Sequence, residues 1–107
     1  MSMAVLWHNP RCSTSRKTLA LLQERGVEPE VRLYLQDAPS RGELSALGLP
    51  GKALLRWKDA PELSRELTDD AILDLLAERP ALIERPILIA KGRAAIGRPP
   101  EAVLDIL

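Results

Sequence analysis

The hydrophobic positions at the start of the chain predict a strand, a helix and a second strand. Residues 4–7 form a short apolar run that indicates a strand. Residues 13–25 have helix-forming composition and stop at Gly26, a common helix-ending residue. Residues 31–35 alternate and include β-branched and aromatic side chains, which favours a strand. A helix between two strands predicts a parallel, right-handed crossover.

The middle of the chain carries the signals of short helices. Ser40 and Glu43 have the spacing of a capping box, which predicts a helix over residues 41–47. Residues 52–56 predict a further helical turn. Residues 61–67 give an ambiguous pattern, which we interpret as helical in part.

A longer helix is predicted after Thr68. Thr68 is a hydroxyl N-cap, and the carboxylates of Asp69 and Asp70 fall in the first turn. An apolar stripe with helical spacing follows at Ile72, Leu73, Leu75 and Leu76, and Pro80 ends the helix. The two aspartates could also be read as a metal or acid–base pair. No histidine or third ligand accompanies them, so helix capping is the better interpretation.

The last part of the chain predicts a β-hairpin and a final helix. Residues 86–90 and 93–96 indicate strands, and Lys91 with Gly92 has the length of a two-residue hairpin turn. Residues 101–107 begin a helix. The expected fold class is α/β, with the parallel unit and the hairpin in one mixed four-stranded sheet and helices packed on it.

Composition limits the classes of function. The chain has 107 residues, of which 46% are hydrophobic and 28% charged, which predicts one globular domain over residues 1–107. The formal net charge of zero argues against general binding of nucleic acid or of an anionic membrane. A single cysteine permits no internal disulfide, and neither a signal peptide nor an apolar run of membrane-spanning length is visible. We therefore expect a cytoplasmic protein.

That cysteine, Cys12, lies in the predicted strand-to-helix loop, at or just before the helix N-terminus. Unpaired N–H groups and the helix dipole favour an anion there, either a thiolate or an oxyanion ligand. Lowering a thiol pKa by about 2 units requires about 2.7 kcal/mol, whereas a helix terminus supplies about 0.3–1 kcal/mol. Hydrogen bonds and nearby cations must supply the rest. The alternative is a buried apolar cysteine, but polar and cationic neighbours make a poor core.

Arginine outnumbers lysine by eleven to four, and arginine is the better residue for forked recognition of tetrahedral oxyanions. The candidates are Arg56, Arg85 and Arg98, although spacing alone does not show that they converge. Arg85 precedes Pro86, and such a bond can be cis.

Several other chemistries fit the sequence poorly. Thr18 stands where a cysteine phosphatase would carry its phosphate-binding arginine, and Ser15 replaces the second thiol of a dithiol motif. One histidine and one cysteine do not make a metal site by themselves, so none is predicted.

The stretch His8–Leu19 closely resembles the signature of the ArsC-like arsenate reductases, the family coupled to glutaredoxin. Matches continue in order along the chain, at residues 33–35, 39–41, 53–56, 67–70, 82–87, 97–101 and 103–107. The resemblance implies a thioredoxin-like (glutaredoxin-like) fold with an inserted helical region.

The resemblance also implies roles for individual residues. Cys12 matches the nucleophile that attacks arsenate, and the oxyanion-binding arginines match Arg56, Arg85 and Arg98. Pro86 matches the structural cis-proline. His8 and Ser15 match residues that help to stabilise the thiolate.

The implied reaction reduces arsenate to arsenite through a covalent thio-arsenate on Cys12. Glutathione serves as co-substrate and glutaredoxin as partner, and no bound cofactor is expected. Two alternatives stay open on this fold. One is a glutathione-linked thiol oxidoreductase of unknown substrate, and the other is a non-enzymatic, redox-sensing transcriptional regulator that binds RNA polymerase.

Overall fold

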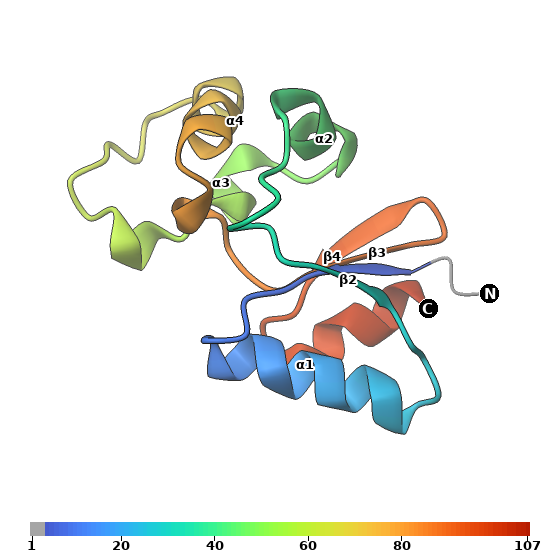
Figure 1. Cartoon of the computed structure of the whole chain (residues 1–107). Helices are drawn as coiled ribbons and strands as arrows, with labels where there is room; N and C mark the ends of the chain where they lie inside the picture. Colours follow the sequence, from blue (N-terminus) through green and yellow to red (C-terminus); the bar gives the residue numbers. More distant parts are fainter. Residues whose placement is uncertain (1–3) are drawn as a thin grey trace. The chain divides into compact units, whose positions relative to one another are not determined.

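The computed structural model describes residues 4–107, which form two compact units (Figure 1). The sheet unit comprises the chain up to Asp37 together with Arg85–Leu107, and the helical unit is Ala38–Glu84. The helical unit is thus inserted in sequence into the sheet unit, as expected. The assignment of 1–107 to one domain stays a prediction.

The sheet unit contains the predicted mixed sheet. Its four strands are β1 (Val5–Trp7), β2 (Glu30–Arg32), β3 (Ile87–Ala90) and β4 (Arg93–Ile96), in the order β2-β1-β3-β4. β1 pairs with β2 in parallel, whereas β1 with β3 and β3 with β4 are antiparallel. The α/β fold class is confirmed.

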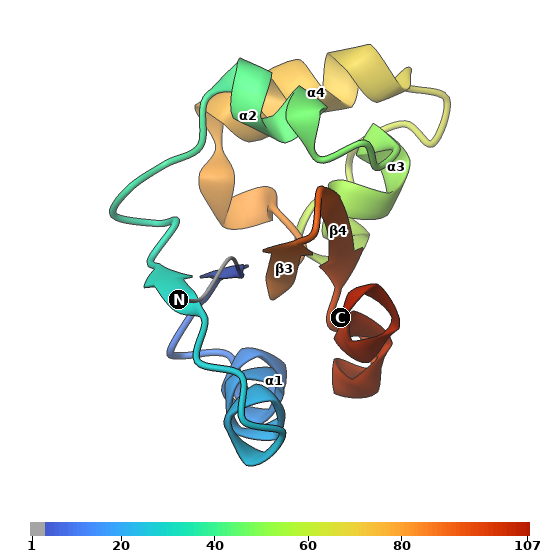
Figure 2. The same cartoon turned by 90° about the vertical axis from the view of Figure 1, so that its right-hand side faces the viewer.

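Two helices lie side by side along one face of this sheet, α1 (Ser13–Glu24) and the 3-10 helix η3 (Pro100–Ile106) (Figures 1 and 2). Apolar side chains of the sheet and of both helices form the core between them: Ala4, Leu6, Leu22, Leu88, Ala90, Val103 and Ile106. Burying such side chains contributes roughly 1.5–3 kcal/mol for each large one, which fixes α1 against the sheet.

The hairpin turn is as predicted. Lys91 and Gly92 have φ angles of 54° and 73°, so both residues adopt the left-handed conformation of a two-residue turn that follows the twist of the strands. This turn sets the register in which Ile87 pairs with Ile96.

The end of β2 and the type of the last helix differ from the prediction. β2 ends at Arg32, and residues 33–37 form a turn in which Gln36 and Asp37 both donate backbone hydrogen bonds to the Leu33 carbonyl, each at 2.9 Å. The alternating pattern of residues 31–35 was therefore overridden by a local turn. The last helix is a 3-10 helix throughout its length.

The helical unit contains α2 (Arg41–Ala46), α3 (Gly51–Leu54), η1 (Trp57–Asp59), α4 (Asp69–Glu78) and η2 (Pro80–Leu82). Its core is formed by buried side chains from these elements and from the residues that directly follow α3 and η2: Leu44, Leu54, Leu55, Ile72, Leu73, Leu76, Leu82 and Ile83.

Both predicted caps of the helical unit are present. Ser40 and Glu43 form the reciprocal capping box of α2, and the Thr68 hydroxyl accepts the Ala71 N–H at 3.1 Å. The prediction of partial helix over residues 61–67 is wrong. That segment forms separate turns, because the Ser64 side chain and other local acceptors take its N–H groups.

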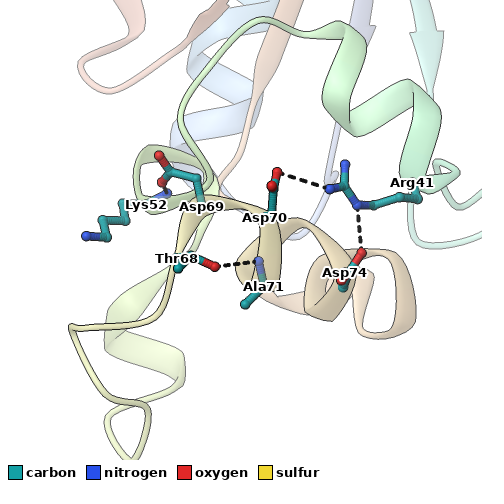
Figure 3. Close-up of polar contacts among 7 residues, drawn as sticks. All are labelled: Arg41, Lys52, Thr68, Asp69, Asp70, Ala71 and Asp74. Carbon is teal, nitrogen blue, oxygen red and sulfur yellow. Dashed lines mark hydrogen bonds and ion pairs between the residues drawn. The ribbon is translucent and has the colours of Figure 1, made fainter.

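Figure 3 shows the polar residues that connect α2 and α3 to α4. The Arg41 guanidinium donates to Asp74 at 2.7 Å and to Asp70 at 3.4 Å, and the Lys52 N–H donates to the Asp69 carboxylate at 2.9 Å. The two aspartates that sequence reasoning assigned to helix capping thus hold structural contacts as well.

We predict that the Thr68 cap contributes more stability than the Arg41 ion pairs. Thr68→Ala should lower the free energy of unfolding by about 1 kcal/mol, because it leaves an N–H of the first turn unpaired. Arg41→Ala should cost less than about 1 kcal/mol, because its carboxylate partners are 89% and 71% exposed. Urea denaturation of both variants measures the difference, and equal or reversed costs would contradict the prediction.

Candidate active site

Cys12 is the N-cap residue of α1 and follows the loop after β1. Its backbone N–H donates to the Asn9 carbonyl at 3.0 Å, which turns the loop into the helix. The side chain is partly exposed, so the alternative of a fully buried core cysteine does not hold.

The sulfur is surrounded by hydrogen-bond donors. Partial burial raises the pKa of Cys12, but the backbone N–H groups of Ser15 and Thr14, the Arg85 side chain and the charge of Arg98 act in the opposite direction. Together they lower the pKa of the thiol below its ordinary value. The site therefore favours the nucleophilic thiolate.

Two of the predicted arginines meet at this sulfur. Arg98 Nη2 lies 3.5 Å from Cys12 Sγ, and Arg98 Nε donates to the Arg85 carbonyl at 2.8 Å. The peptide bonds Arg85–Pro86 and Arg98–Pro99 are both cis, and sequence reasoning had considered only the first.

His8 reaches the site through Ser15. His8 Nδ1 lies 2.6 Å from Ser15 Oγ, which also accepts the Asn9 N–H at 3.1 Å. Ser15 thus engages His8 with its hydroxyl and the sulfur with its backbone N–H. Burial of the ring, and then the charge of Arg16, lower the pKa of His8, so that the ring is neutral at neutral pH.

Arg56, the third predicted arginine, lies in the helical unit. Backbone hydrogen bonds from Arg56 to Leu82 and from Glu84 to Leu54 align these segments. The Arg56 guanidinium bonds Asp59 at 2.9 Å and Glu84 at 3.0 Å. Burial alone lowers the pKa of Arg56, but the two carboxylates raise it overall. Its role toward an oxyanion stays a prediction.

Sequence reasoning missed Asn9 as an organiser of the loop. Its carbonyl accepts the Cys12 N–H, its N–H donates to Ser15, and its side-chain oxygen accepts the Arg11 N–H at 3.0 Å. The Asn9-Pro10 dipeptide, a frequent turn starter, was the available signal.

Over residues 4–107, no cluster of three His, Cys, Asp or Glu side chains has the arrangement of a metal site. In the same range, none of the helices has the length and apolar character needed to cross a bilayer.

The site thus consists of a partly exposed thiol flanked by arginines, at the start of a helix of a thioredoxin-like fold. Residues 7–106 match the ArsC family, and the chain belongs to that family.

Similar proteins agree with this assignment. The "Uncharacterized protein YfgD" of Escherichia coli K12 is 46% identical, over 95% of this chain and 94% of its own length. An "Arsenate reductase" of Neisseria meningitidis serogroup B is 44% identical, over 95% and 96%. The solved structure of an "Arsenate reductase from Vibrio cholerae" superposes with a TM-score of 0.86 at 45% identity and covers all of both chains.

We predict that Arg98→Ala raises the pKa of Cys12. Loss of the cation should reduce the thiolate fraction at neutral pH about three- to tenfold. Ultraviolet absorbance of the thiolate and the pH profile of iodoacetamide alkylation measure the effect. Arg93→Ala, which removes an exposed arginine of β4, is the matched control. The same shift in both variants would show that general charge, rather than Arg98, acts on the sulfur.

A second prediction concerns His8, the only histidine of the chain. Its lowered pKa in the folded state means that the unfolded chain binds a proton more readily. The contribution of neutral His8 to the free energy of unfolding should therefore be fully present above about pH 6.5, the ordinary histidine pKa. It should be lost as the pH falls through the lowered pKa of the folded state. In His8→Gln this part of the pH dependence should disappear. Urea denaturation across this range would refute the prediction if wild type and variant lost stability in parallel.

Proposed function

We propose that this protein is an arsenate reductase that uses Cys12 as its nucleophile. The observation that carries the proposal is the contact between Arg98 and the Cys12 sulfur, with Arg85 beside it. Similar proteins named arsenate reductase, at 40–46% identity over nearly the whole chain, support arsenate as the substrate.

The proposed first step forms a sulfur–arsenic bond. Arg85 and Arg98 hold the arsenate oxygens, together with the helix N–H groups, and Arg56 acts as a third oxyanion-binding residue. The thiolate of Cys12 attacks arsenic, an oxygen of arsenate leaves as water after protonation, and a thio-arsenate ester remains. His8 and Ser15 support the thiolate by fixing the loop.

Reduction then requires two electrons from thiols. The chain has one cysteine, so it cannot form a disulfide within itself. In our proposal, glutathione attacks the ester and a glutaredoxin thiol completes the reduction. Arsenic passes from the +5 to the +3 state, two external thiols become one disulfide, and arsenite leaves Cys12. No bound cofactor takes part. This dependence on reduced thiols favours a cytoplasmic location.

The test is an arsenate-dependent assay with purified protein, glutathione, glutaredoxin and glutathione reductase. We expect NADPH consumption only when arsenate and the protein are both present. Cys12→Ser should reduce turnover to the background rate, because a hydroxyl is far less ionised than a thiol at neutral pH. Arg93→Ala serves as the matched control and should retain turnover.

The alternatives give different results in the same assay. A glutathione adduct on Cys12 that glutaredoxin removes, without any dependence on arsenate, would replace the proposal by a thiol oxidoreductase of another substrate. Retention of RNA polymerase on the immobilised protein, with no turnover in an active coupling system, would favour a regulator.

A further inference from the structure

Gly97 occupies a position that has no room for a side chain. Its φ is not in the left-handed region, so backbone conformation does not require a glycine there. A Cβ at this position would lie 2.8 Å from Pro86 Cγ and 2.8 Å from Thr18 Oγ1. Real Cβ atoms do not approach other atoms so closely, and the Gly97 N–H already donates to the Pro86 carbonyl at 2.9 Å. Residue 97 is therefore enclosed on two sides.

Neither Pro86 nor Thr18 can move easily to make room for a side chain at residue 97. The Pro86 ring is rigid and buried. Thr18 is fully buried in α1, is β-branched, and donates from Oγ1 to the Thr14 carbonyl at 2.9 Å. This bond holds the hydroxyl in the orientation that meets Gly97.

The residue after this contact is Arg98, whose guanidinium reaches the Cys12 sulfur. Helix α1 carries Cys12 at its N-cap and Thr18 in its second turn. The same helix thus positions the sulfur and, through Gly97, the backbone from which Arg98 extends. A shift of about an ångström at residue 97 would therefore substantially change the 3.5 Å distance between Arg98 Nη2 and Cys12 Sγ.

We propose that Thr18 and Gly97 are positioning residues that set the reach of Arg98 to the Cys12 sulfur. This inference deepens the proposed function, because it rests on Cys12 and Arg98 working as a pair. It gives a buried threonine and a glycine an indirect role in the reactivity of the Cys12 thiol.

The test measures the pKa and alkylation rate of Cys12 in folded variants. Gly97→Ala should raise the pKa and slow alkylation at neutral pH about three- to tenfold, because Arg98 is displaced from the sulfur. Gly42→Ala is the matched control, since its new Cβ would meet only Ser40 Oγ at 3.8 Å, and its rate should equal that of wild type. A folded Gly97→Ala with an unchanged pKa would overturn the inference.

Variants of Thr18 keep the test decisive if Gly97→Ala does not fold. Thr18→Ala removes the hydroxyl that packs against Gly97 and should slow alkylation about two- to threefold. Thr18→Ser keeps this hydroxyl and should match wild type. In the double variant Gly97→Ala/Thr18→Ala, the two reductions in alkylation rate should not multiply, because residues 18 and 97 share one contact. Equal rates for Thr18→Ala and Thr18→Ser would count against the inference.

The outcome is separable from the proposed function. Alkylation of Cys12 requires no arsenate, so the expected rates without arsenate turnover would leave the positioning role intact and refute only the reductase. Normal arsenate turnover by the wild type, with unaltered alkylation in folded Gly97→Ala, would support the reductase and refute only the positioning role.

Discussion

The contact between the Cys12 sulfur and the arginines beside it is the interaction on which the site depends. A thiolate and an oxyanion repel each other, by about 4 kcal/mol at 4 Å with an effective dielectric constant of about 20. The terminus of α1 supplies only about 0.3–1 kcal/mol of attraction. In the proposed reaction, the positive charge of Arg98 and the hydrogen bond from Arg85 would offset this repulsion.

The hairpin explains why these two arginines meet, although they are thirteen positions apart. The turn at Lys91 and Gly92 pairs Ile87 with Ile96, and the same register continues beyond the strands. The Gly97 N–H donates to the Pro86 carbonyl, which extends the register by one pair, and the Arg98 side chain then donates from Nε to the Arg85 carbonyl. The hairpin turn thus determines which part of the chain lies opposite Arg85.

The pairing of Arg85 with Arg98 could also be predicted from the sequence. Counting back from a two-residue turn at Lys91 and Gly92 places Arg85 opposite Arg98, and this needed no structure. The helix caps and the loop of Cys12 were equally local, and they were predicted. The end of β2 was not predicted, because alternating apolar residues fit both a strand and a turn. The hydrogen bonds to the Leu33 carbonyl stabilise the turn instead of a longer strand. The fit of Thr18 against Gly97 could not be read from sequence, because it depends on packing between α1 and the hairpin.

Arg56 differs from the other two arginines in its electrostatics. Its guanidinium is paired with Asp59 and Glu84, so its positive charge is already balanced by carboxylates. A guanidinium carries five N–H donors, and these two bonds leave further donor capacity. If Arg56 binds an oxyanion, it therefore acts chiefly as an oriented hydrogen-bond donor, because its charge is compensated. The attraction that brings an anion toward the sulfur must then come from the sheet unit, where Arg85 and Arg98 flank Cys12.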